Sequence, residues 1–191
     1  MVFTSLVAAL TATTALLLAL SPQPLLPDSS SSLLAVDSPH ALDAIFQTQA
    51  AVQANRWQYV YVHHSRTPAG SAAALAQLNG GLGDHFVIGN GNGCVDGEIQ
   101  IGQRWNHQLS ATPPQGADEI DPACISICLV GDFDQAEPTR SQFRRLSQLV
   151  ATLQQRFNVP ASHVLLVEAG QTPASIGRQF PADSFRGELA R

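Results

Sequence analysis

The sequence predicts an α/β domain with a mixed central β-sheet flanked by helices. Strand-like and helix-like segments alternate along the chain after residue 55. The segment from Ile125 to Gly131 is almost continuously apolar, which is typical of a strand buried on both faces. A helical segment that begins at Thr139 carries a regular apolar stripe. Together these patterns predict one sheet with helices packed against it.

The first half of this domain is expected to contain two helices and a strand. A helix is predicted from Pro39 to about Asn55, because apolar residues recur near helical spacing at Leu42, Ile45, Phe46 and Val52. The aromatic and β-branched run 57–63 predicts a strand. The Ala-rich run 71–78 predicts a second helix, which the following Asn-Gly-Gly would stop.

The second half continues the alternation. Residues 85–89 and 98–101 are predicted to form a strand pair, because Asn-Gly-Asn-Gly between them is a strong turn signal. The spacing of Thr139 and Gln142 predicts a capping box at the start of the long helix, and Pro160 is expected to end that helix. A strand at 163–167 and a short helix around Phe185 and Leu189 complete the prediction.

The N-terminal segment differs in composition from the rest of the chain. Residues 1–20 are nearly all apolar or small and, if helical, would extend roughly 30 Å, which is borderline for spanning a bilayer. They are predicted to be a signal peptide or a membrane anchor, followed by a Pro/Ser-rich linker at 21–38 and a folded domain at 39–191. We therefore expect an exported protein that is periplasmic, in the cell envelope or membrane-anchored.

Charge and cysteine content exclude some kinds of site. The net charge is −5 and all ten basic residues are Arg, which argues against a nucleic-acid partner. Cys124 and Cys128 are four residues apart in a predicted strand, roughly 13 Å, too far for a disulfide. Cys94 could pair with either only if the fold brings them together. The spacing of the three cysteines is not that of a zinc finger.

Five segments in order resemble the N-acetylmuramoyl-L-alanine amidases of the phage-lysozyme and peptidoglycan-recognition-protein type. The resemblance covers roughly residues 57–181, and no one segment carries it alone. The segments are His63-His64-Ser65, Asp84-His85-Phe86-Val87-Ile88, Asp96-Gly97-Glu98-Ile99 with Arg104-Trp105, residues 125–133 (ISICLVGDF), and Gly177-Arg178-Gln179-Phe180-Pro181.

This resemblance implies a fold and a chemistry. Such amidases bind Zn²⁺ through two His and one Cys and leave a fourth position for water, which the metal makes nucleophilic near neutral pH. The zinc also polarises the lactyl-amide carbonyl of muramoyl-L-alanine. A Tyr beside the site, and a Lys or Thr just before the Cys, support the developing charge.

The family's site positions are mostly replaced in this sequence. His63 matches the first zinc ligand, whereas a count without gaps puts Val167 at the second ligand and Ser175 at the third. The Tyr position becomes Asp84 and the Thr or Lys position becomes Pro173. Because neither Val nor a neutral Ser replaces His or a thiolate, we expect no tightly bound zinc, unless the site has been rearranged.

The resemblance therefore predicts a domain that binds muropeptides from peptidoglycan, or a wall-associated protein, and has lost zinc and catalysis. One alternative is an active amidase with a rearranged metal site. Another is a structural or interaction domain without glycan binding. Whether the chain is an enzyme stays open at this point.

Several further side chains are candidates for the site. The resemblance suggests substrate binding by His64, His85, Arg104 and Trp105, although strand alternation turns His64 away from His63 and also favours a structural role for it. A rearranged metal site could draw on other donors, among which Asp84 could approach His63. These donors are Asp84, His85, His107, Asp118, His163 and Glu168.

Overall fold

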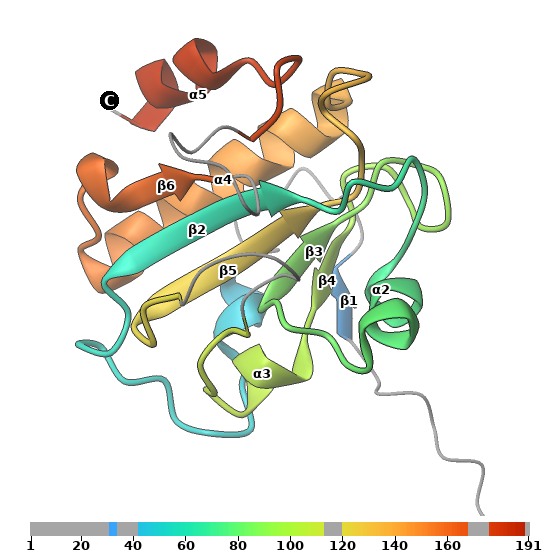
Figure 1. The fold of residues 1–191 in the computed structure, drawn as a ribbon. Coiled ribbons are helices and arrows are strands. Elements are labelled where there is room, and N and C mark those ends of the chain that lie inside the picture. Colours follow the sequence, from blue (N-terminus) through green and yellow to red (C-terminus); the bar gives the residue numbers. More distant parts are fainter. Residues whose placement is uncertain (1–30, 34–41, 113–119, 168–175, 190–191) are drawn as a thin grey trace, which may run out of the picture.

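The computed structural model describes residues 31–33, 42–112, 120–167 and 176–189, and its centre is a six-stranded mixed sheet (Figure 1). The strand order is β1-β4-β3-β5-β2-β6. β3, β5, β2 and β6 run parallel to one another, while β4 is antiparallel to both β3 and β1. The strands are β1 (Ser31–Leu33), β2 (Tyr59–His64), β3 (Phe86–Ile88), β4 (Ile99–Ile101), β5 (Cys124–Leu129) and β6 (Val164–Leu166).

Helices surround this sheet. They are the 3-10 helices η2 (Asp43–Phe46) and η3 (Ala161–His163) and the α-helices α2 (Ala72–Asn79), α3 (Gln103–Asn106), α4 (Arg140–Phe157) and α5 (Ala182–Leu189). Figure 1 shows α4 lying behind β2 and β5. Ala72 and Leu75 of α2 pack in a second cluster with Val87 of β3 and Cys128 of β5. The predicted fold class, a mixed sheet flanked by helices, is confirmed.

The β5 strand lies in the interior of the sheet, and all six of its residues are buried. It pairs with β2 on one side and with β3 on the other. A strand that is covered on both faces needs apolar or small side chains throughout, as the sequence of this segment predicted. The parallel register places His63 of β2 next to Cys128 of β5, and Cys128 next to Val87 of β3.

The long helix α4 begins and ends where the sequence predicts. The Thr139 side chain accepts a hydrogen bond from the Gln142 backbone N–H (3.0 Å), and the Gln142 side chain accepts one from the Thr139 N–H (3.2 Å), which makes the capping box. At the other end Asn158 adopts a left-handed conformation (φ 56°) two residues before Pro160.

One face of α4 fills the core beneath the sheet. Its fully buried apolar residues are Leu146, Leu149, Val150 and Leu153. They belong to one cluster with the inward side chains of β2 and β5. Burying each such side chain contributes roughly 1.5–3 kcal/mol to folding, so this face holds the domain together.

The helix predicted for residues 39–55 is wrong over most of its length. Only Asp43–Phe46 is helical, as the single turn η2, and residues 34–41 lie outside the described part. The apolar spacing reflects burial of Leu42 and Ile45 rather than a longer helix. Beyond it, the Ala50 N–H donates to the Asn106 carbonyl (2.9 Å), so a tertiary contact takes a backbone group that a helix would use internally.

Part of the segment predicted as a linker lies on the sheet. Ser31–Leu33 forms β1 and pairs with β4 along the sheet edge. The predicted signal peptide or anchor, residues 1–20, falls outside the described residues. Where the chain is described, no helix has the length and apolar character needed to cross a membrane.

Candidate metal and ligand site

A cleft of about 560 Å³ opens where β2 and β5 end at their carboxyl termini. His63, Asp84 and Cys128 line it, together with residues of α2 and the arginines Arg66 and Arg104. In α/β folds, ligand sites commonly lie at the carboxyl ends of parallel strands. We call this cavity the strand-end cleft.

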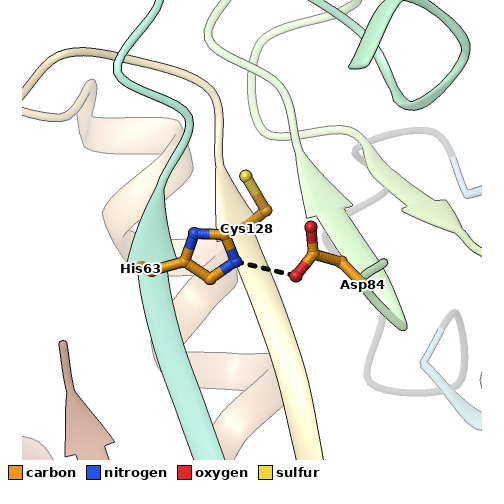
Figure 2. Close-up of side chains that lie close together, drawn as sticks. All are labelled: His63, Asp84 and Cys128. Carbon is orange, nitrogen blue, oxygen red and sulfur yellow. Dashed lines mark hydrogen bonds and ion pairs between the residues drawn. The ribbon is translucent and has the colours of Figure 1, made fainter. Parts of the chain in front are cut away.

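His63 and Asp84 form a buried ion pair at this cleft. The His63 Nε2 and Asp84 Oδ1 atoms are 2.7 Å apart (Figure 2), and the exposed fractions of the two side chains are 7% and 12%. Burial alone would lower the pKa of His63, but the charge and hydrogen bond of Asp84 outweigh it and raise that pKa above 6.5. The shift favours the protonated ring, which donates Nε2–H to the carboxylate.

The Asp84 carboxylate is also held by a neighbouring strand. The Ser126 hydroxyl of β5 donates to Asp84 Oδ1 at 2.5 Å. Burial tends to raise the pKa of Asp84, whereas His63 and the hydrogen bonds from His63 and Ser126 lower it below 3.8. The aspartate is thus ionised. Its short distance to His63 confirms the prediction that Asp84 could approach His63.

Cys128 completes a three-residue cluster that the sequence did not predict. Its Sγ atom lies with a His63 nitrogen and an Asp84 oxygen, all within 4.8 Å of one another (Figure 2). Burial, and then the charge of Asp84, raise the pKa of the Cys128 thiol well above 9, so it is neutral. The parallel pairing of β2 with β5 brings Cys128 beside His63, and spacing along the chain carries no signal for that register.

His64 faces away from His63 as strand alternation requires. Its ring stacks on Phe133, with ring centroids 5.3 Å apart, and its Nδ1 accepts a hydrogen bond from the Phe133 backbone N–H (3.1 Å). The residue also lines the strand-end cleft at the end of β2. It can therefore support the loop after β5 while its edge remains at the cleft.

His85 and Trp105 are fully buried. His85 Nε2 donates to the Leu109 carbonyl (2.8 Å), while its Nδ1 accepts from the Ser126 N–H (2.9 Å). Burial lowers the pKa of His85 to about 4, so the ring is neutral. Trp105 donates to the Ile45 carbonyl. Both residues hold the structure beneath the cleft, and substrate binding by them stays a prediction.

Arg104 belongs to the cleft wall. Its Nη1 donates to the Ser110 carbonyl at 2.7 Å, which fixes the guanidinium beside α3. Its predicted contact with substrate is therefore compatible with its position, and it stays a prediction.

Of the other predicted family positions, Val167 is described, and it continues β6 beside β2. In the register of β2 and β6, Val62 pairs with Leu166, so the next residue, Val167, stands beside His63. The Val167 N–H donates to the Val62 carbonyl (2.9 Å), which continues the strand ladder. Ser175 and Pro173 lie outside the described residues.

Of the remaining donors considered for a rearranged metal site, two are described by the structure and two are not. His163 hydrogen-bonds the Gln58 carbonyl and stacks on Tyr59, at the opposite end of β2 from the cleft. His107 is exposed beyond α3 and does not line the cleft. Asp118 and Glu168 are not among the described residues. Among the candidate donors in the described part of the chain, Asp84 is the one that lies next to His63.

Solved amidase structures share this fold. The N-acetylmuramoyl-L-alanine amidase LysC from Clostridium intestinale URNW superposes with a TM-score of 0.55 at 18% identity, covering 75% of this chain and 92% of that one. The endolysine LysCS from the same organism gives 0.55 and 18%, covering 75% and 90%. PGRP-Hd from Alvinella pompejana gives 0.43 and 18%, covering 70% and 83%. A comparison with curated proteins finds no match.

The family profile of N-acetylmuramoyl-L-alanine amidase matches residues 53–177 of this chain, more than half of its length. The chain therefore belongs to the N-acetylmuramoyl-L-alanine amidase family.

Two of the predicted zinc-ligand positions of the family, His63 and Val167, lie in the part of the chain that the structure describes. Val167 beside His63 offers no side-chain donor, and its backbone N–H is occupied by the sheet. His63 itself directs Nε2 to Asp84. Besides His63, the donors that the structure brings together at this end of the sheet are Asp84 and Cys128.

Proposed function

We propose that this domain binds muropeptide fragments of peptidoglycan in the strand-end cleft and does not hydrolyse them by the family's zinc mechanism. The observation that carries the proposal is the retained cleft of about 560 Å³ over His63, combined with Val167 at the adjacent inherited position. A cavity of this size suits a small ligand with a sugar and a short peptide.

The composition of the cleft supports such a ligand. Arg66 and Arg104 contribute positive charge to its lining, while Leu75 and Leu82 contribute apolar surface. Stem peptides carry carboxylates, which guanidinium groups bind by charge-assisted hydrogen bonds. The same lining offers no equivalent of the family's Tyr, because Asp84 takes that position and is engaged by His63 and Ser126.

Calorimetric titration of the full chain with muramyl tripeptide tests this proposal. The wild type should release or absorb heat with saturation, and no peptide should be cleaved, with or without added zinc. Asn79→Trp should weaken binding at least about tenfold, about 1.4 kcal/mol, by filling the cleft that Asn79 lines. Gln77→Trp is the matched control, since Gln77 is exposed on the same helix and does not line the cleft.

Saturating heat that is equal in Asn79→Trp and wild type would place binding elsewhere. The absence of heat from the wild type would instead support a structural or interaction domain, for example one that contacts a wall-associated protein. Export to the periplasm or cell envelope, by signal peptide or tether, is part of this proposal and rests on the apolar run at residues 1–20.

A second candidate function is amide hydrolysis by a rearranged site. The clustering of His63, Asp84 and Cys128 favours it. Zinc-dependent release of the stem peptide from a muropeptide, abolished in His63→Ala, would establish this activity and overturn the non-hydrolytic proposal.

A further inference from the structure

We propose that His63, Asp84 and Cys128 form a binding site for a zinc-like divalent cation, built from a donor set different from the one the family uses. This inference does not depend on muropeptide binding. Donor atoms of the three side chains lie within 4.8 Å of one another.

Three separate segments place these donors. His63 lies near the end of β2, Cys128 is its register partner on β5, and Asp84 lies two residues before β3. Figure 2 shows the three side chains converging from these neighbouring segments. Since the segments belong to one rigid sheet and its adjoining turn, the cluster is preorganised rather than assembled by surface loops.

Outer hydrogen bonds support the first two donors in the way that metal sites require. His63 Nδ1 lies 3.3 Å from the His64 carbonyl, which leaves Nε2 directed into the cluster. The Ser126 hydroxyl orients the Asp84 carboxylate. In metalloproteins a carbonyl behind the histidine and a donor to the carboxylate fix ligand orientation, and their loss lowers affinity about 10–100-fold.

The donor atoms lie within 4.8 Å of one another and need to shift toward tetrahedral spacing to bind one metal. The His63 Nε2 and Asp84 Oδ1 atoms are 2.7 Å apart without a metal. Donors of this kind around tetrahedral zinc are roughly 3.3 Å apart, so the two side chains need to separate by about half an ångström. All three residues line the strand-end cleft, so a cation has a path to them and a fourth position can face the cleft.

The donor types select the metal. One imidazole nitrogen, one thiolate and one carboxylate oxygen suit Zn²⁺ or Co²⁺, whereas Mg²⁺ and Ca²⁺ take oxygen donors. Binding replaces the proton on His63 Nε2 and the proton on Cys128 Sγ. The cation thus enters as two protons leave, and no oxidant or reductant takes part.

Cobalt titration of the full chain tests the site without relying on activity. A thiolate bound to Co²⁺ gives a charge-transfer absorption in the near ultraviolet. This band should appear and saturate at one Co²⁺ per chain, and Zn²⁺ should displace it. Cys128→Ser should abolish the band and weaken binding at least about 100-fold, and Asp84→Asn should weaken it at least about tenfold.

The double variant Cys94→Ser/Cys124→Ser is the matched control, since it leaves Cys128 as the sole thiol of the chain. It should retain the band, and circular dichroism shows that each variant is folded. No band in the folded wild type, or a band that survives in Cys128→Ser, would overturn the proposal. Muropeptide titration of the metal-free chain is scored separately, so either proposal can fail alone.

Discussion

The two faces of the central sheet use the same strands for opposite purposes. On the face toward α4, Val60 and Val62 of β2 and Ile125 and Ile127 of β5 are fully buried in one apolar cluster. On the other face the intervening residues include His63, Ser126 and Cys128. Adjacent residues along each strand therefore point to two different faces: an apolar face that stabilises the domain, and a face with polar and ionisable side chains.

Burial is similar on both faces, so exposure does not distinguish them; chemistry does. Apolar burial on the α4 face contributes favourable free energy without requiring partners. The attraction between His63 and Asp84 roughly offsets the cost of removing both charges from water. Removing one partner therefore leaves the other with an uncompensated desolvation cost. The cleft face therefore depends on specific pairs, and single substitutions there should act through charge.

Asp84→Ala should have the largest effect, a loss of about 3–5 kcal/mol in the free energy of unfolding, because it leaves His63 buried without the partner that stabilises its charge. The raised pKa of His63 makes its contribution present below about pH 6.5 and lost as pH rises through the folded-state pKa. Urea unfolding should therefore show a larger loss near pH 6 than near pH 9, values chosen around the ordinary histidine pKa of about 6.5.

Asp183→Ala is the control for this change. Asp183 is fully exposed and lies 3.9 Å from Arg186 on the surface of α5. Its removal should leave the unfolding midpoint unchanged at both pH values. Equal losses for the two aspartates would contradict the distinction between the buried pair and a surface pair.

Leu149→Ala probes the α4 face and should destabilise the domain by about 3 kcal/mol at any pH, because it creates a cavity in a fully buried site. Leu78→Ala is the matched substitution at a leucine that is 70% exposed, and it should change stability by less than about 0.5 kcal/mol. Chemical denaturation measures both. A pH-dependent effect of Leu149→Ala would mean that the two faces are coupled.

His85 gives the cleft side a second pH dependence, of opposite sign. Its folded pKa of about 4 lies below its ordinary value of 6.5, so the unfolded chain binds the proton first as pH falls. The contribution of neutral His85 to the free energy of unfolding should be fully present above about pH 6.5. It should decline toward pH 4 by up to roughly 3 kcal/mol.

The difference between wild type and His85→Gln isolates this effect in urea unfolding measured across that pH range. His107→Gln is the control, because His107 is exposed. It should retain the slope of the wild type. A wild-type slope that persists in His85→Gln would assign the pH dependence to other groups.

Thr139→Ala should have the smallest effect, about 1 kcal/mol, through loss of the capping box at the start of α4. Thr139→Ser keeps the hydroxyl and should restore most of the stability. Thermal unfolding compares the two. The Thr139 hydroxyl also donates to Asp96, but neither residue lines the strand-end cleft, so cobalt titration should give the same result in both variants.

Much of the fold could be predicted from local sequence. The capping residues Thr139 and Gln142, the apolar stripe of α4 and the continuous apolar run of β5 each specify an element within a few residues. The wrong helix at residues 39–55 shows the limit, since Leu42 and Ile45 have helical spacing for reasons of burial in a short turn. There a backbone contact with Asn106 competes with helix formation.

The sequence by itself determined most of the strands and helices of the sheet core and the family, because these follow from local patterns and ordered motifs. Only the tertiary structure decided that Asp84 pairs with His63 and that Cys128 stands beside them. Their proximity depends on which strands pair and in what register. Register is fixed by packing of the whole sheet, so no spacing along the chain encodes it.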